Sequence, residues 1–152
     1  MKAGRDRRIE RLLGILNRDI VRESRMADAC LRQAACLPRQ YHPVARRLIA
    51  ACAAVALANA TALAAEVRAL GGSPVIPGRR APAEPLPTRP IGSGLAAART
   101  MLAHYRRRLR TAQELRLPRL REVLRQILRT RQRHLLHIAF IEAGSPGRYA
   151  WN

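Results

Sequence analysis

The feature that most constrains this chain is a repeat of apolar residues near its carboxyl end. Between Leu117 and Ile141, apolar side chains recur at alternating steps of three and four residues, which places them on one face of an α-helix. The positions on this face are Leu117, Leu120, Leu124, Ile127, Arg131, His134, Ile138 and Ile141. Two of them, Arg131 and His134, are polar. The pattern therefore predicts a helix that faces a bundle core and carries two polar side chains into it.

The same spacing predicts three further helices. They cover Arg5–Leu37, Val44–Leu70 and Leu95–Leu115. Only short connections separate the first helix from the second and the third from the fourth, so each of these pairs should be antiparallel. Aromatic residues make up 3% of the chain, so we expect a core of closely packed helices with small side chains. The prediction is one all-α domain over residues 1–152.

Polar residues also interrupt the apolar faces of the first two helices. The face of the first helix contains Ile9, Leu13, Leu16, Ile20, Glu23, Ala27, Cys30 and Ala34. Glu23 is its single charged member, and a glutamate is seldom buried unless an opposite charge or hydrogen bonds compensate it. Asn59 similarly interrupts the face of the second helix. Tyr105 on the third helix is interpreted as an ordinary core residue.

A segment rich in proline and glycine, Gly71–Gly94, separates the second helix from the third. It contains six prolines and five glycines, a composition that neither a helix nor a central strand tolerates. An extended chain of this length can span the roughly 40 Å length of a 27-residue helix. The segment is therefore predicted to cross the length of the bundle, so that the second and third helices are parallel and the order is up-down-down-up.

The formal net charge of +19 is extreme for a chain of 152 residues. A row of arginines on the fourth helix contributes to it, and so does a cluster on the third. The candidates for anion binding are Arg121, Arg125, Arg129, Arg133, Arg106, Arg107, Arg108 and Arg110. Such a surface suits nucleic acid or another polyanion, although it is equally consistent with a solvated arginine-rich face. The near absence of aromatic residues argues against reading of individual bases.

The cysteines and the apolar segments bear on localisation. Cys30, Cys36 and Cys52 show no metal-binding spacing and are interpreted as small core residues in a reducing compartment. The amino-terminal residues lack the apolar core of a signal peptide. The uncharged segment 48–65 is long enough to be considered as a membrane span, but its alanine content and Asn59 favour a buried helix. We expect a cytoplasmic protein that does not enter a membrane.

The polar core positions, taken together, resemble a known metal site. Ferritin-like di-iron proteins place a Glu on each of two helices and a Glu-x-x-His on each of the other two. The corresponding positions here are Glu23, Ala56 with Asn59, Ala98, and Arg131 with His134. The chain resembles a bacterioferritin in the stretches LNRDIVRE (16–23), NATALAAEVRALGGSP (59–74) and LREVLRQILRTRQRHLLHI (120–138). The resemblance implies a ferritin-like four-helix bundle, ferrous iron oxidation and iron storage.

The chain departs from this family pattern at most ligand positions. Only Glu23 and His134 keep a family ligand type, whereas Ala56, Asn59, Ala98 and Arg131 do not. Leu57 stands at the position that the resemblance assigns to the haem-binding methionine, so haem is not expected. No resident cofactor is expected either, and iron enters only through the resemblance. The family's short fifth helix is also missing, so a dimer is expected rather than a closed shell.

The interpretation of the interior is that Glu23 and Arg131 form an ion pair in the space of the family's metal site, with Asn59 and His134 hydrogen-bonded beside it. His134 is interpreted as a satisfied core histidine in preference to a remaining metal ligand.

Three functions follow as alternatives. The chain is a non-catalytic bacterioferritin-like subunit, alone or assembled with an active relative; a nucleic-acid-binding, DNA-protecting ferritin-like protein; or a weakly active ferroxidase.

Overall fold

The computed structural model describes residues 2–36, 43–76 and 92–143. These form four helices: α1 (Lys2–Cys36), α2 (Pro43–Ala69), α3 (Gly92–Glu114) and α4 (Pro118–Ala143). No strand occurs in the described residues. All four predicted helices are confirmed, with ends within three residues of the prediction.

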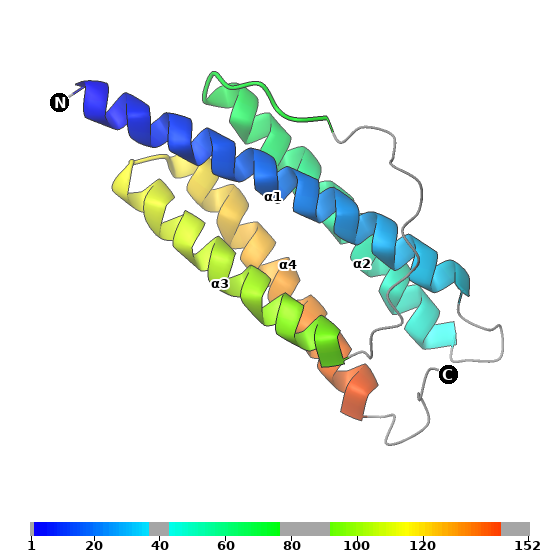
Figure 1. Cartoon of the computed structure of the whole chain (residues 1–152). Coiled ribbons are helices and arrows are strands. Elements are labelled where there is room, and N and C mark those ends of the chain that lie inside the picture. Colours follow the sequence, from blue (N-terminus) through cyan, green and yellow to red (C-terminus); the bar gives the residue numbers. More distant parts are fainter. Residues whose placement is uncertain (1, 37–42, 77–91, 144–152) are drawn as a thin grey trace.

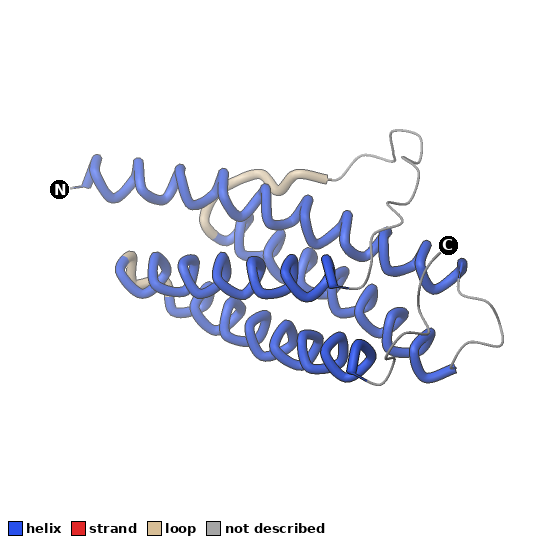
Figure 2. The backbone as a smooth tube through the Cα atoms, turned by 60° about the horizontal axis from the view of Figure 1, so that its bottom comes forward, coloured by secondary structure: helices blue, strands red, loops and turns tan. Residues whose placement is uncertain are grey.

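The helices lie side by side along one long axis (Figures 1 and 2). Helix α1 packs antiparallel to α2, α3 packs antiparallel to α4, and α2 also approaches α4. Helices α2 and α3 run in the same direction, which confirms the predicted up-down-down-up order (Figure 1). The predicted path of residues 77–91 along the bundle, the connection at 37–42 and the tail at 144–152 lie outside the described residues.

Two helices end in the same hydrogen-bonded turn but with different residues. After α2, Gly71 N donates to Arg68 O and Gly72 N donates to Val67 O, each at 2.9 Å, and Gly71 has a φ of 83°. This is the Schellman arrangement, and its left-handed position favours glycine. After α3, Arg116 occupies the equivalent position with a φ of 54°. The sequence places Gly71 directly after the predicted second helix, as this turn favours, whereas nothing in the sequence indicates an arginine in that conformation.

The start of the crossover is fixed to α1 by a side chain that the sequence analysis did not single out. Asn17 Nδ2 donates to Ser73 O at 3.1 Å, and Val75 N donates to Asn17 Oδ1 at 2.9 Å. Gly72 also approaches α1 so closely that an added Cβ would lie 2.8 Å from a methyl carbon of Leu13. The chain after α2 therefore turns back along α1, as the green segment in Figure 1 shows.

The apolar core forms two clusters at different levels of the bundle. The larger one is built mainly from leucine and isoleucine of all four helices, with Leu16, Leu63 and Leu124 fully buried, and it also contains Tyr105. The smaller one consists of Ala27, Ala53 and Ala56 between α1 and α2. On α1 the buried position is Leu12 rather than the predicted Leu13, which is half-buried. The predicted core residue Cys52 is buried, Cys30 is half-buried, and both are free thiols.

Helix α2 contains the one segment of the described residues, Arg46–Ala69, that is long and apolar enough to cross a membrane by length and composition. A third of its most apolar window, 33%, is buried inside the bundle. Its buried face carries the polar residues Asn59 and Glu66. Core helices often meet the same criteria, so the segment is weak evidence for a membrane span.

Candidate functional site

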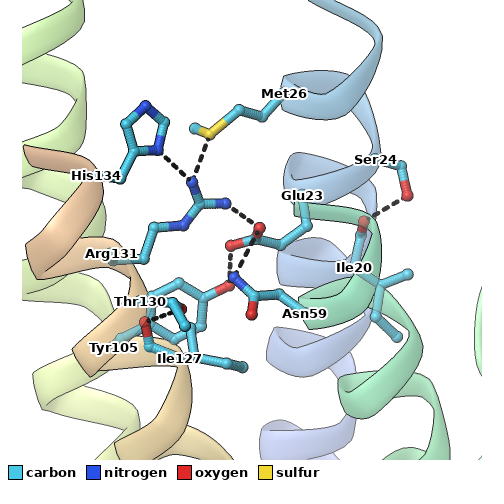
Figure 3. A network of polar contacts seen from close by, with 10 residues as sticks. All are labelled: Ile20, Glu23, Ser24, Met26, Asn59, Tyr105, Ile127, Thr130, Arg131 and His134. Atoms are coloured by element: carbon cyan, nitrogen blue, oxygen red, sulfur yellow. Dashed lines mark hydrogen bonds and ion pairs between the residues drawn. The ribbon is translucent and has the colours of Figure 1, made fainter. Parts of the chain in front are cut away.

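The polar residues in the interior converge on the carboxylate of Glu23, which is completely buried (Figure 3). Arg131 Nη2 forms an ion pair with Glu23 Oε2. The Tyr105 hydroxyl donates to Oε1 at 2.6 Å, and Asn59 Nδ2 donates to Oε2 at 3.3 Å. Each helix therefore contributes one member: Glu23 from α1, Asn59 from α2, Tyr105 from α3 and Arg131 from α4. We call these four residues the central network.

Local sequence explains why these side chains reach the same level. Glu23 lies three and seven residues after the buried Ile20 and Leu16, and Arg131 lies four and seven residues after the buried Ile127 and Leu124. Each occupies the inward face of its helix because residues three, four and seven apart share a face. The predicted ion pair is confirmed, and so is the predicted hydrogen bond from Asn59.

The guanidinium of Arg131 makes further contacts beyond the carboxylate. Its Nη1 donates to Met26 Sδ at 2.9 Å and lies 3.2 Å from His134 Nδ1. Because a guanidinium can only donate, His134 Nδ1 must accept and its proton must be on Nε2. Burial lowers the pKa of His134 to about 4, helped by the positive charge of Arg131 and by His137. His134 is therefore a neutral acceptor that supports the arginine, which agrees with the predicted core role.

Tyr105 has a role that its interpretation as a plain core residue missed. It is 1% exposed, and its hydroxyl is directed at the carboxylate of Glu23 (Figure 3). Burial, the negative charge of Glu23 and the hydrogen bond to it all raise the pKa of Tyr105 well above its usual range. The phenol is thus held protonated as a donor. A tyrosine in an apolar face is also a common packing residue, so the sequence alone gave no sign of this contact.

A second buried acid, Asp19, was not anticipated. It is 2% exposed on α1, one turn before Glu23. Arg22 Nη1 donates to Oδ1 at 3.0 Å, and Arg108 Nε donates to Oδ2 at 3.1 Å, so this pair connects α1 to α3. A third acid, Glu66 on α2, is 5% exposed and faces Arg119 at 3.5 Å. The bundle thus uses part of its arginine content to neutralise buried carboxylates.

This finding changes the interpretation of the anion-binding candidates. Arg108 is directed inward at Asp19, and Arg125 forms an ion pair with Glu122 at 3.5 Å. Arg121 is half-buried. The remaining candidates are exposed and have no acidic partner among the described residues. They are Arg106, Arg107, Arg110, Arg129 and Arg133.

The other positions named from the resemblance occupy different surroundings. Ala56 is fully buried in the alanine cluster, and Ala98 is half-buried on α3, two turns before Tyr105. Leu57 is 49% exposed and faces outward from α2. No group of three or more histidine, cysteine, aspartate or glutamate side chains that could hold a metal occurs in the described residues.

The donor set at the central network does not fit a dinuclear iron centre. Such a centre needs several carboxylates and imidazoles around two cations. Here a permanently protonated guanidinium is bonded to the only carboxylate of the network, and it would repel a divalent cation at this distance. The His134 Nδ1 accepts from that same guanidinium. No step of chemistry through iron can be derived from these residues.

Comparison with known proteins supports the architecture. No protein-family model and no curated protein matches the sequence. Among solved structures, the chain is similar to one described as a "ferritin like, diiron-carboxylate" protein from Bacillus anthracis strain Ames, with a TM-score of 0.74 and 21% sequence identity. The match covers 88% of this chain and 96% of that chain. The chain therefore has the ferritin-like four-helix bundle fold.

Proposed function

We propose that this chain is a bacterioferritin-like protein, of the iron-storage and ferroxidase type, in which the protein's own ion pair fills the interior position of the metal site. It acts as a non-catalytic cytoplasmic subunit, as a dimer or assembled with an active relative. The observation that carries the proposal is the buried ion pair between Glu23 and Arg131. At this position, metal-binding proteins of the same fold need carboxylates that bind the metal ions.

Two further observations support this proposal. Tyr105 and Asn59 both donate hydrogen bonds to the Glu23 carboxylate, so each of its oxygens has a protein partner. His134 accepts from Arg131 instead of facing an open cavity. The Glu23 carboxylate is thus satisfied without a metal, although Arg131 Nε is buried without a hydrogen-bond partner.

The test measures ferrous iron oxidation, oxygen consumption and iron bound per chain. The wild type should bind no stoichiometric iron and consume no more oxygen than a buffer blank. A variant that combines Ala56→Glu, Asn59→His, Ala98→Glu and Arg131→Glu restores the ligand types of the family pattern and should gain both properties. The matched control carries the first three substitutions but keeps Arg131, and it should stay inactive. Wild-type protein that binds a dinuclear centre and consumes oxygen would overturn the proposal.

The assembly state has its own experiment. Native mass spectrometry of the purified chain should give a dimer, and co-expression with an active bacterioferritin should give mixed assemblies if the chain serves as a partner subunit. Mixed assemblies should show iron uptake that falls in proportion to the fraction of this chain. A monomer that never enters the active assembly would contradict the subunit role.

A second candidate function, binding of a polyanion such as the DNA backbone, is favoured by the exposed arginines Arg106, Arg107, Arg110, Arg129 and Arg133. Phosphate contacts would make such binding steeply salt-dependent and insensitive to sequence. Replacing Arg129 and Arg133 by Gln should reduce the slope of log affinity against log salt by about 2. Replacing Arg108, which faces Asp19, should leave the slope unchanged as long as the helical content is retained. Affinity that does not fall with added salt would exclude this function.

A further inference from the structure

Two cysteines lie at the same level of the bundle on facing helices. Helices α1 and α2 are antiparallel, and the hydrogen bond between Asn59 and Glu23 fixes which residues face each other. Cys30 follows Glu23 by seven residues, and Cys52 precedes Asn59 by seven residues. Both steps therefore advance in the same direction, by about 10.5 Å along the bundle. Seven residues return a helix to almost the same face, with a drift of about 20°. This register therefore places Cys30 and Cys52 opposite each other on the two helices.

The alanine cluster brings the two helices close at this level. Ala27, Ala53 and Ala56 are completely or almost completely buried there, and Cys30 packs against them. Helices in contact through small residues have axes about 8–10 Å apart, and each Cα lies about 2.3 Å from its axis. Facing Cα atoms are then roughly 3.5–5.5 Å apart, a range that overlaps the 4.4–6.8 Å of a disulfide.

The surroundings of the two thiols are also compatible with a bond between them. The Cys30 side chain is half-buried and so open to a small oxidant, whereas Cys52 is 8% exposed. Burial raises the pKa of both thiols, to about 11 for Cys52, and the neighbouring Cys30 contributes to that rise. Arg131 acts in the opposite direction on both groups. The electrostatic influence of one thiol on the other is a second sign of their proximity, and the raised pKa values predict a slow reaction.

We propose that Cys30 and Cys52 form a reversible disulfide that ties α1 to α2 when the protein meets a peroxide. Hydrogen peroxide oxidises the Cys30 thiol to a sulfenic acid and releases one water. The Cys52 thiol then attacks that sulfur, the S–S bond forms, and a second water leaves. Two thiols are oxidised and one peroxide is reduced, and a thiol reductant reverses the bond by exchange. This inference is independent of the proposed function, because it uses neither iron nor a partner.

The experiment uses the full chain carrying Cys36→Ser, so that only the two thiols in question remain. Folded protein is treated with hydrogen peroxide or, in parallel, with diamide, and then denatured. Free thiols should fall from two to none per chain, the intact mass should drop by two hydrogen atoms, and peptide mapping should join the segments containing Cys30 and Cys52. Dithiothreitol should restore both thiols. The oxidised form should also unfold at a higher urea concentration than the reduced form.

The matched controls carry Cys30→Ser or Cys52→Ser in the same background, with helical content checked by circular dichroism. Neither should lose two hydrogen atoms or gain urea resistance. The proposal is overturned if the two thiols stay free under both oxidants, if they pass to sulfinic or sulfonic acids without a bond, or if they link two chains instead of two helices of one chain.

Discussion

Helix α1 carries two buried carboxylates one turn apart, and the protein neutralises them in different ways. Glu23 is paired with Arg131, whose side chain is 3% exposed, so both charges are removed from water. Asp19 is paired with Arg22 and Arg108, whose side chains are 42% and 15% exposed. A partner that reaches the surface can return to water when its carboxylate is lost, whereas a buried partner cannot. The two acids are similarly buried, but we expect the loss of Glu23 to destabilise the protein more than the loss of Asp19.

The largest expected effect tests the inner of these two pairs. Glu23→Ala should lower the free energy of unfolding by about 3–5 kcal/mol, because the Arg131 guanidinium is left buried without an opposite charge. Urea denaturation followed by circular dichroism measures the loss. The control is Glu10→Ala, which removes an exposed glutamate of the same helix and should change stability by less than about 0.5 kcal/mol. Equal stability of Glu23→Ala and the parent would show that the pair is not formed.

Removing both charges of the Glu23–Arg131 pair together measures how far the two residues depend on each other. Glu23→Gln combined with Arg131→Met leaves no charge in the central network and keeps an oxygen for the Tyr105 hydroxyl. The double variant should be more stable than either single variant, with a coupling energy of roughly 2–3 kcal/mol in a double-mutant cycle. Additive single effects would mean that the two residues are independent.

The outer pair should respond less. Asp19→Ala should cost about 2 kcal/mol, because the freed guanidinium groups of Arg22 and Arg108 can turn toward solvent. The same urea titration applies, and the informative quantity is the difference from Glu23→Ala. A loss as large as that of Glu23→Ala would mean that solvent exposure of the arginine partners does not reduce the cost of removing the carboxylate.

These two acids also mark how far the sequence could predict the structure. The helices and the Glu23–Arg131 pair were predictable because each residue interrupts a regular apolar face. Asp19 was missed because the buried face of the first helix was predicted as one narrow row of residues. In the structure the buried surface of α1 is wider and includes the adjacent positions Leu12 and Asp19. The contacts of Tyr105 and Asn17 were missed for another reason. They depend on how distant helices and the crossover are placed, and the spacing within one helix carries no information about that.

The histidine beside the inner pair should make stability depend on pH. His134 has a pKa of about 4 in the folded chain against 6.5 when unfolded, so it is neutral in both states above about pH 6.5. As pH falls from 6.5 toward 4, His134 binds a proton in the unfolded chain but stays neutral in the folded chain. The free energy of unfolding therefore decreases. The loss should be about 1 kcal/mol after allowance for the exposed part of the ring.

The measurement compares unfolding free energies at several pH values in the parent and in His134→Asn. The amide keeps an acceptor for Arg131 and does not titrate, so the parent should show the steeper decline between pH 6.5 and 4. His137→Asn, which replaces an exposed neighbour on the same helix, serves as the control and should keep most of the parent's slope. Identical slopes in the parent and His134→Asn would mean that the ring is not held neutral.

The smallest expected effect on stability comes from an ion pair in which both side chains are exposed. Arg8 and Glu114 form a salt bridge between α1 and α3, but their side chains are 50% and 61% exposed. Exposed pairs gain little, because water screens the charges and both side chains lose freedom. Arg8→Ala should therefore change the free energy of unfolding by less than about 0.5 kcal/mol. Together with the other variants, it should give a cost that rises with burial of the partner from Arg8 through Asp19 to Glu23. A loss above 1 kcal/mol for Arg8→Ala would contradict this order. It would mean that a salt bridge between two exposed side chains still contributes substantially to stability.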